Sequence, residues 1–250
     1  MQHIVGLLGY PLTHSFSPNY FNNKWAQTNQ TNWQYQTYQY QNIIDAVHFL
    51  KQVPHLVGFN ITIPHKQNIV PYLQSLAACA KAIGAVNCVH IINNKWVGFN
   101  TDYLGFKNSF QQLLNPSIPL GKALILGNGG AAKAVKYSLQ ILGISYTIVE
   151  RNPKINSIAF TAVNANVLQQ YQYIINTTPL GTFPNINHAP ALPYHAINSN
   201  HIAYDLVYNP AETLFLKNCK TQGAIIKNGS DMLAIQADES WKIWNNLQVL

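Results

Sequence analysis

The chain has 250 residues, enough for one large domain or two modest domains that each bury a core. Hydrophobic residues make up 48% of the chain and charged residues only 9%, which excludes an intrinsically disordered protein. We find no apolar run of membrane-spanning length and no secretory signal pattern in the first ten residues, so we expect a soluble, cytoplasmic protein. The three cysteines form no Cys-x-x-Cys pair and the nine histidines no His-x-x-x-His pair, so we expect neither a disulfide framework nor a metal site.

The formal net charge is +7, which is compatible with nucleic acid or with small anionic ligands. The lysines are dispersed along the chain, and no interleaving of aromatic and basic residues is evident, so we expect a small anion rather than nucleic acid. Two scarcities stand out. Arg151 is the single arginine, and Asp45 is the single acidic residue before Asp102.

The first hundred residues alternate strand patterns with helix patterns, which predicts an α/β architecture with a largely parallel sheet. We expect strands at 3–8, 33–40 and 56–63, helices from the Ser15–Pro18 segment and over 43–50 and 75–82, and a hairpin over 86–99 turning at Asn93-Asn94. Ser17 is the expected N-cap of the first helix, with Pro18 at its first helical position. In the second strand Tyr35 and Thr37 are expected on one face and Tyr38 on the other.

The second half begins with a helix over 103–114 and a linker at 115–119. A buried strand, Leu124–Leu126, then enters the tight turn Gly127-Asn128-Gly129-Gly130, which is followed by a helix over 131–142. Such a helix N-terminus attracts a pyrophosphate, and the glycines let the backbone approach it. Further strands are expected at 145–149, within 173–179, and at 201–206 and 224–227, with a loop over 181–200 and a final helix over 231–248 that could fold back on the first domain.

Polar side chains gather where the predicted strands of the first domain end. Asn60, Thr62 and Lys66 follow one strand, and Asn87 and Asp102 occupy comparable junctions. Ligands of open α/β sheets bind beyond the carboxyl ends of the strands. Taken singly, each residue has an ordinary explanation as a solvated lysine, a turn former or a helix cap. Their combination is what carries information.

These residues belong to a set of motifs that spans nearly the whole chain. The strings are Gly9-x-Pro11 with Ser15-x-Ser17-Pro18, Asn60-x-Thr62-x-Pro64-x-Lys66, Gly84-Ala-Val-Asn87, Asn100-Thr101-Asp102-x-x-Gly105, Gly127-x-Gly129-Gly130-Ala131, Arg151-Asn152, Asn176-x-Thr178-Pro179-x-Gly181, Tyr204-Asp205-x-x-Tyr208 and Gly229-x-x-Met232-x-x-x-Gln236. In order and spacing the chain resembles the shikimate dehydrogenases, which reduce 3-dehydroshikimate to shikimate.

The resemblance implies two α/β domains with a cleft between them. Residues 1–101 plus 231–250 would form a substrate-binding catalytic domain with a mainly parallel sheet, and residues 102–230 an NADP-binding Rossmann-like domain. The implied activity is the reversible, NADPH-dependent step of the shikimate pathway, which serves chorismate and aromatic amino acid biosynthesis. The implied ligands are shikimate or 3-dehydroshikimate and NADP, with no metal, and the protein would be a monomer or homodimer.

The resemblance also implies roles for individual residues. Lys66 would be the acid/base, assisted by Asp102, and which of the two is the formal base stays open. The implied substrate-binding residues are Ser15, Ser17, Asn60, Thr62, Asn87, Tyr208 and Gln236. The implied cofactor-binding residues are Gly127, Asn128, Gly129, Gly130, Ala131, Arg151, Asn152, Lys154, Thr177, Leu206 and Gly229.

Two neighbouring residues give opposite indications about the choice between NADP and NAD. Arg151 stands where the family binds the adenine and 2′-phosphate of NADP, and a guanidinium suits phosphate geometry. Glu150, however, stands where a carboxylate normally binds the ribose 2′-hydroxyl of NAD and would repel a 2′-phosphate. We expect NADP. The alternatives are an NAD-dependent quinate/shikimate dehydrogenase, a catalytically silent ligand-binding relative and, from charge alone, a nucleic-acid-binding module.

Overall fold

A computed structural model describes residues 2–12 and 15–245 of the chain. The chain divides into two compact units, residues 1–102 with 236–250 and residues 103–235. The second boundary falls after 235 rather than after the expected 230, because one continuous helix, α9 (Ser230–Trp244), contributes its first turns to the second unit and the rest to the first. The predicted cleft between the domains stays a prediction.

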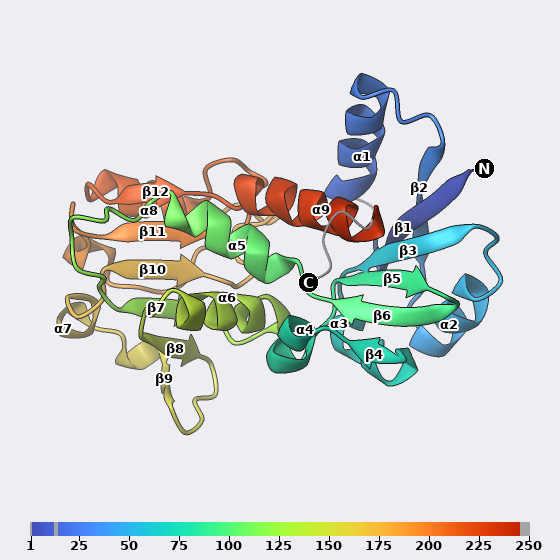
Figure 1. Ribbon diagram of the computed structural model, residues 1–250. Coiled ribbons are helices and arrows are strands. Elements are labelled where there is room, and N and C mark those ends of the chain that lie inside the picture. The colour runs from blue at the N-terminus through green and yellow to red at the C-terminus, as the bar shows by residue number, and fades with distance from the viewer. Residues whose placement is uncertain (1, 13–14, 246–250) are drawn as a thin grey trace. The chain divides into compact units, whose positions relative to one another are not determined.

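The first unit is built on a six-stranded sheet in the order β2-β1-β3-β5-β6-β4 (Figure 1). Its strands are β1 (His3–Gly9), β2 (Trp33–Gln39), β3 (Leu56–Ile61), β4 (Ser75–Leu76), β5 (Cys88–Ile92) and β6 (Lys95–Phe99). β1 pairs parallel with β2 and β3, and β4 pairs parallel with β6, whereas β5 is antiparallel to β3 and β6. The antiparallel pair is the predicted hairpin, and Asn93 and Asn94 take the positive φ angles that such a turn requires.

Both faces of this sheet are covered. The helices are α1 (Phe16–Gln27), α2 (Ile43–Leu50), α3 (His65–Asn68) and α4 (Ala78–Ile83), with a 3-10 turn at Val70–Tyr72. One buried cluster joins the sheet to α1 and the end of α9 through Phe21, Tyr35 and Trp244. A second cluster joins the opposite face to α2 and includes Tyr38 and Leu50. The predicted return of the final helix to the first domain is confirmed, and its expected residues 246–248 lie outside the described residues.

Two local predictions for the first unit are wrong, and one is confirmed. The N-cap of α1 is Ser15, whose extended backbone precedes the helix, and Ser17 is a buried helical residue. Pro18 is the third residue of α1, two positions later than expected, and is tolerated there because the first-turn N–H groups have no intrahelical partners. The confirmed prediction is that Tyr35 and Tyr38 lie on opposite faces of the sheet, and both are buried because both faces are covered. The expected helix over 75–82 begins as strand β4 and becomes helical only at Ala78.

The second unit is an all-parallel sheet in the order β12-β11-β10-β7-β8-β9. Its strands are β7 (Ala123–Leu126), β8 (Tyr146–Glu150), β9 (Ser157–Ala159), β10 (Tyr173–Asn176), β11 (Ile202–Asp205) and β12 (Ile225–Lys227). Chain order runs outward from β7 in one direction and from β10 in the other. This is the doubly wound dinucleotide-binding order, and its switch point lies between β7 and β10.

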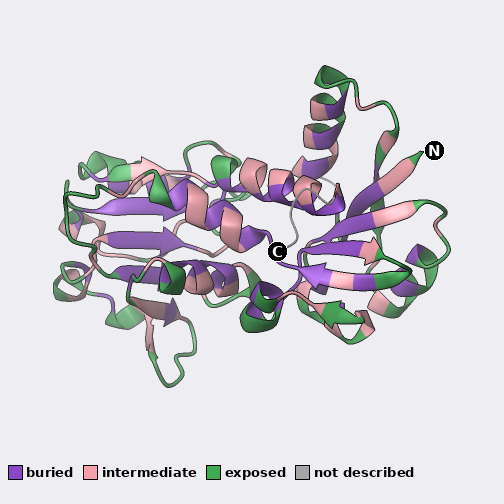
Figure 2. Cartoon of the chain, in the orientation of Figure 1, coloured by how far each residue is buried: buried purple, intermediate pink, exposed green. Residues whose placement is uncertain are grey.

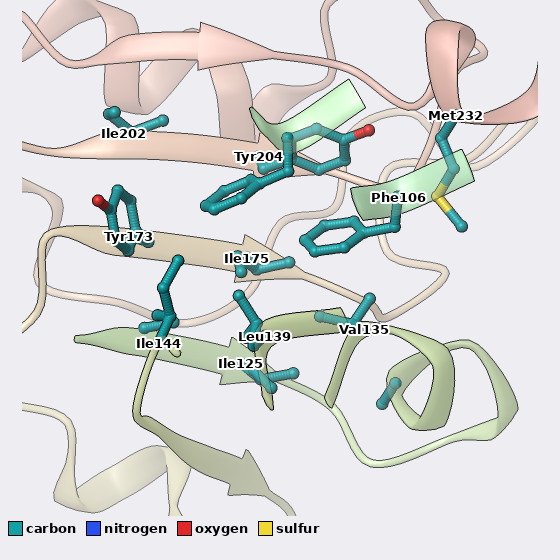
Figure 3. Packing of buried hydrophobic residues seen from close by; sticks show 13 residues of the cluster. Phe106, Ile125, Val135, Leu139, Ile144, Tyr173, Ile175, Ile202, Tyr204 and Met232 are labelled. Atoms are coloured by element: carbon teal, nitrogen blue, oxygen red, sulfur yellow. The ribbon is translucent and has the colours of Figure 1, made fainter. Parts of the chain in front are cut away.

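Helices cover both faces of the second sheet. This agrees with β7, in which successive residues point to opposite faces and all are buried. The helices are α5 (Asp102–Gln111), α6 (Gly130–Ile141), α7 (Ala165–Leu168) and α8 (Leu214–Thr221), with 3-10 turns at Phe160–Ala162 and Tyr194–Ala196. Ile125 points to the face where Phe106 of α5 and Val135 of α6 pack, with Tyr204 and Met232 (Figure 3). Leu124 and Leu126 belong to the cluster on the opposite face, with α7 and α8. Figure 2 shows the central strands as the buried part of this unit.

Three short elements of the second unit were not predicted, namely β9, α7 and α8. β9 has three residues and α7 four, too few to show a periodicity. α8 could have been found, since Thr213 is its N-cap and accepts a hydrogen bond from the backbone of Leu216.

Candidate active site

An ion pair between Lys66 and Asp102 lies at the carboxyl ends of two strands of the first unit. Lys66 is on α3, just after β3, and Asp102 follows β6. Lys66 Nζ is 2.6 Å from Asp102 Oδ2. The side chains are 22% and 12% exposed, respectively. The pair is therefore shielded from most of the solvent but open to a small ligand.

The second oxygen of Asp102 is fixed by an amide. Asn87 Nδ2 donates to Asp102 Oδ1 at 2.8 Å, and the backbone N–H of Thr101 donates to Asn87 Oδ1 at 2.6 Å. Asn87 Nδ2 is also 3.3 Å from Gln236 Oε1 on α9. The backbone contact determines which way the amide of Asn87 faces, so that its N–H groups point to the carboxylate. One oxygen of Asp102 thus faces the ammonium and the other is held in place.

Asn60 extends this network toward the interior of the first unit. Its Oδ1 accepts from the Tyr35 hydroxyl at 2.9 Å, and its Nδ2 donates to Ser240 Oγ at 2.9 Å and to the Asn87 carbonyl at 3.2 Å. Ser240 Oγ is also 3.1 Å from Thr101 Oγ1. Both amide hydrogens of Asn60 are therefore used within the protein, and only its oxygen has capacity left for a ligand hydroxyl.

Tyr35 and Ser240 are part of this network but are absent from the sequence-based set, and Thr101 appeared there only within a motif. A signal for Ser240 existed, since it lies four residues after Gln236 and so on the same face of a helix. Burial raises the pKa of Tyr35 well above its ordinary value, and a hydrogen bond with Ser17 opposes that shift. Tyr35 therefore stays protonated and acts as a fixed donor to Asn60.

Three other predicted substrate-binding residues have different surroundings. Ser15 donates its hydroxyl to the carbonyl of Leu12 at 3.1 Å. Thr62 follows β3, where its backbone N–H donates to Leu8 and its methyl group leaves no room for a Cβ on Gly9. Tyr208 belongs to the second unit, where it is half-buried and burial raises its pKa.

The glycine turn of the second unit connects β7 to α6 at the switch point. Gly127 has a φ of +101°, which favours glycine, and a Cβ there would lie 2.9 Å from Thr177 Oγ1. Gly129 and Gly130 differ, because a Cβ on either would meet nothing within 4 Å. Neither packing nor a positive φ explains these two glycines, which leave the exposed N-terminus of α6 open.

Further predicted cofactor residues surround the same edge of the sheet. Thr177 follows β10 and donates its hydroxyl to the carbonyl of Leu126 at 2.8 Å. Gly229 approaches Leu206 so closely that a Cβ would lie 2.2 Å from its carbonyl oxygen. Ala131 is the second residue of α6. The ends of β7, β10 and β11 thus bring Gly127, Thr177 and Leu206 to one edge.

The connection between β8 and β9 presents the remaining predicted residues. Arg151, Asn152 and Lys154 are all exposed there. Glu150, at the end of β8, accepts hydrogen bonds from Asn128 and Ser157. The bond from Ser157, and to a smaller extent the bond from Asn128, holds the pKa of Glu150 below its usual value.

This edge fits a dinucleotide on its own chemistry. An open helix N-terminus with two glycines that nothing else requires can accept a pyrophosphate, and exposed cations lie at the end of the next strand. Among residues 2–12 and 15–245 no group of three or more His, Cys, Asp or Glu side chains could hold a metal ion. Within the same residues, no helix combines the length and apolar character that crossing a membrane requires.

Comparison with known proteins adds independent information. Residues 7–89 match the family model for the shikimate dehydrogenase substrate binding domain. A relative named shikimate dehydrogenase (NADP(+)), from Methanococcus maripaludis strain S2, is 37% identical over 98% of this chain and 92% of its own.

Two solved structures have the same fold. Shikimate 5-dehydrogenase from Thermus thermophilus, in complex with NADP(H) and shikimate, has a TM-score of 0.85 and 28% identity, covering 98% of this chain and 94% of that one. The ligand-free 5-ketofructose reductase of Gluconobacter sp. strain CHM43 has a TM-score of 0.86 and 26% identity, with the same coverage of both chains. The fold thus occurs in proteins named for different carbonyl substrates.

Proposed function

The chain belongs to the shikimate dehydrogenase family, and we propose that it catalyses the reversible, NADPH-dependent reduction of 3-dehydroshikimate to shikimate. The observation that carries the proposal is the Lys66–Asp102 pair, at 2.6 Å, with the second carboxylate oxygen fixed by Asn87. The first unit would bind the substrate and the second unit NADP.

Lys66 is the proton donor in this proposal. NADPH, when bound, supplies a hydride to the carbonyl carbon of the substrate. The carbonyl oxygen then needs one proton, which the Lys66 ammonium group gives, and in the reverse direction neutral Lys66 takes the proton from the hydroxyl. Asp102 keeps the ammonium oriented through Oδ2 and can accept a hydrogen bond from a substrate hydroxyl. A positioned acid of this kind accelerates a reaction by about 10²–10⁴-fold.

The remaining predicted substrate-binding residues would recognise the substrate's polar groups. Ser15 and Ser17 are proposed to bind its carboxylate, with Tyr208, and Thr62, Asn87 and Gln236 its ring hydroxyls. Asn60 is supported only as an acceptor, since both of its amide hydrogens are used internally. A buried site of this kind rejects an analogue that lacks a hydroxyl, because its own polar groups are then left unpaired.

NADP is proposed to bind along the edge formed by β7, β10 and β11. Gly127, Gly129 and Gly130 would accept the pyrophosphate, with Asn128 and Ala131 beside it. Arg151, Asn152 and Lys154 would contact the adenine and 2′-phosphate, and Thr177, Leu206 and Gly229 would lie against the rest of the cofactor. The M. maripaludis relative is named for NADP(+), which supports this choice.

The compartment and the oligomeric state are also proposals. Cys79, Cys88 and Cys219 are free and buried, which suits a reducing compartment, and we propose the cytoplasm. We propose that the protein functions as a monomer or homodimer.

The direct test is to supply shikimate with NADP⁺, and separately with NAD⁺, and to follow the absorbance of the reduced nicotinamide. We expect a higher kcat/KM with NADP⁺. Quinate and 5-ketofructose are tested in parallel, because the first represents the NAD-dependent alternative and the second is the substrate in the name of a structural neighbour. Faster turnover of quinate or 5-ketofructose than of shikimate or 3-dehydroshikimate would contradict the proposed substrate. If none of these compounds is turned over, the result would favour a catalytically silent relative.

Replacement of the proposed acid tests the mechanism. Lys66→Ala should lower kcat by at least about a hundredfold and leave shikimate affinity little changed, since the ammonium acts mainly in the chemical step. Lys81→Ala, which removes an exposed lysine of the same unit, is the matched control and should behave as the unaltered protein. Near-normal kcat in Lys66→Ala would remove Lys66 from its role.

A further inference from the structure

Glu150 is the feature of the second unit that its proposed function does not explain. It ends β8, the strand whose terminal carboxylate normally accepts the ribose 2′-hydroxyl of NAD and disfavours a 2′-phosphate. In this chain Glu150 is followed directly by Arg151, a residue type suited to that phosphate. The two residues make opposite demands on the cofactor.

Each oxygen of Glu150 accepts one hydrogen bond within the protein. Oε1 accepts from the Ser157 hydroxyl at 2.6 Å, and Oε2 accepts from Asn128 Nδ2 at 3.2 Å. Asn128 Oδ1 in turn accepts from Lys136 Nζ at 3.0 Å, which brings a cation from α6 to the same group. Each oxygen of the carboxylate thus has one internal donor that fixes its orientation, and its charge is partly offset by Lys136.

Ser157 also closes the turn that carries the exposed cations. Its backbone N–H donates to the Lys154 carbonyl at 3.1 Å, and its hydroxyl accepts from the Lys154 backbone N–H at 2.7 Å. Between them Asn156 has a φ of +74°. One hydroxyl therefore ties the turn at Lys154 to Glu150. Arg151, which lies between these two points, is exposed and forms no ion pair with any described residue.

We propose that Ser157, with Asn128, holds Glu150 as an internal anchor of the β8–β9 turn, and that this arrangement determines the preference for a 2′-phosphate. The two bonds hold the carboxylate of Glu150 toward Ser157 and Asn128, and Glu150 thereby fixes the turn that presents Arg151 and Lys154. Ser157 is a positioning residue in this scheme, because it acts through Glu150. The inference rests on the proposed NADP site.

Ser157→Ala is the variant that tests the anchor, because it removes one of the two bonds that hold Glu150 and the bond that ties it to the turn at Lys154. We measure, by titration calorimetry, the affinity for adenosine 2′,5′-bisphosphate and for 5′-AMP, which differ by the 2′-phosphate. We expect the affinity for the bisphosphate to fall about tenfold and that for 5′-AMP to change less than about twofold. Ser157→Thr, which keeps the hydroxyl, should restore the bisphosphate affinity. Ser117→Ala, in the exposed linker, is the control.

Glu150→Gln gives a second test if Ser157→Ala folds poorly. It removes the charge but keeps an oxygen that accepts from Ser157, so an anchored Glu150 predicts unchanged or slightly raised affinity for the bisphosphate and unchanged affinity for NAD⁺. A loss of NAD⁺ affinity in Glu150→Gln would mean that Glu150 binds the ribose and would overturn the inference. Equal losses for both nucleotides in Ser157→Ala, or no loss for either, would also overturn it.

The unaltered protein separates this inference from the proposed function. If it binds 5′-AMP as tightly as the bisphosphate, the proposed NADP preference itself fails. If it prefers the bisphosphate and Ser157→Ala keeps that preference, only the anchor fails.

Discussion

Two buried aspartates show how neighbours set the chemistry of one residue type. Asp102 faces an ammonium and an amide, whereas Asp205, at the end of β11, has only neutral donors. Asn176 Nδ2 and the Val207 N–H each donate to its Oδ1 at 3.0 Å, and the Thr213 hydroxyl donates to its Oδ2 at 2.6 Å. Burial raises the pKa of Asp205 to about 6, although these three hydrogen bonds oppose the shift.

This shift predicts a pH dependence of stability. Because the folded pKa lies above the unfolded value near 4, protonated Asp205 stabilises the fold, and this contribution is lost as pH rises from about 4 through 6. Asp205→Asn mimics the protonated acid and should remove that dependence. Relative to the variant, the unaltered protein should lose about 2 kcal/mol of unfolding free energy between pH 4.5 and 7.5. Urea denaturation at both pH values measures this, and parallel pH profiles would contradict the assignment.

At the scale of an element, the strand–turn–helix from β7 to α6 uses its glycines for different reasons. Gly127 needs its positive φ and lies tightly against Thr177. Gly130 starts α6 with open space where a Cβ would lie. The fold therefore requires glycine at position 127, whereas nothing in the protein itself requires glycine at position 130. Close approach of a bound pyrophosphate would explain the glycine at position 130.

Alanine at each position should separate these requirements. Gly130→Ala should leave the melting temperature unchanged or slightly higher, because alanine favours helix by about 1 kcal/mol, while NADP⁺ affinity falls at least tenfold. Gly127→Ala should lower the melting temperature, because a non-glycine residue at φ +101° is strained. Thermal unfolding and calorimetry with NADP⁺ measure both. Undiminished NADP⁺ affinity in Gly130→Ala would argue against a pyrophosphate at this turn.

At the scale of the whole molecule, each unit has its own hydrophobic clusters, and among the described residues the clusters of one unit include none from the other. The end of α9 is a main component of the first unit. Trp244 packs against Phe21, donates its indole N–H to the Val89 carbonyl at 3.0 Å, and fills the space that a Cβ on Gly58 would need. The tail of the chain therefore completes the unit that contains Lys66.

Removing this side chain should affect the two units differently. Trp244→Ala should destabilise the first unit by about 3–5 kcal/mol, because it leaves a large cavity and removes the hydrogen bond to the Val89 carbonyl. Shikimate binding should then be lost at a lower urea concentration than binding of adenosine 2′,5′-bisphosphate. Trp241→Ala, which removes a less buried tryptophan of the same helix, is the control and should have a smaller effect. Simultaneous loss of both ligands at reduced urea would show that the units unfold together.

Local signals in the sequence were sufficient for most elements. α2 was predicted at its observed bounds, and the structure adds that Asn42 is its N-cap. The hairpin was predicted to turn at Asn93-Asn94, and both residues have positive φ. The α/β class followed from alternating patterns and is confirmed. Family motifs supplied Lys66, Asp102, Asn87 and Gln236, which the structure brings into contact, while their roles stay predictions.

Tertiary structure alone decided what depends on distant partners. The bond from Tyr35 to Asn60 and the bond from Asn60 to Ser240 join residues 25 and 180 positions apart, so no local pattern reveals them. The sequence likewise does not show which groups the Glu150 carboxylate contacts, and the structure gives it hydrogen bonds from Ser157 and Asn128. The periodicity of a sequence indicates whether a side chain is buried. Which atoms that side chain contacts depends on how distant strands and helices pack, and the chemistry of this protein depends on those contacts.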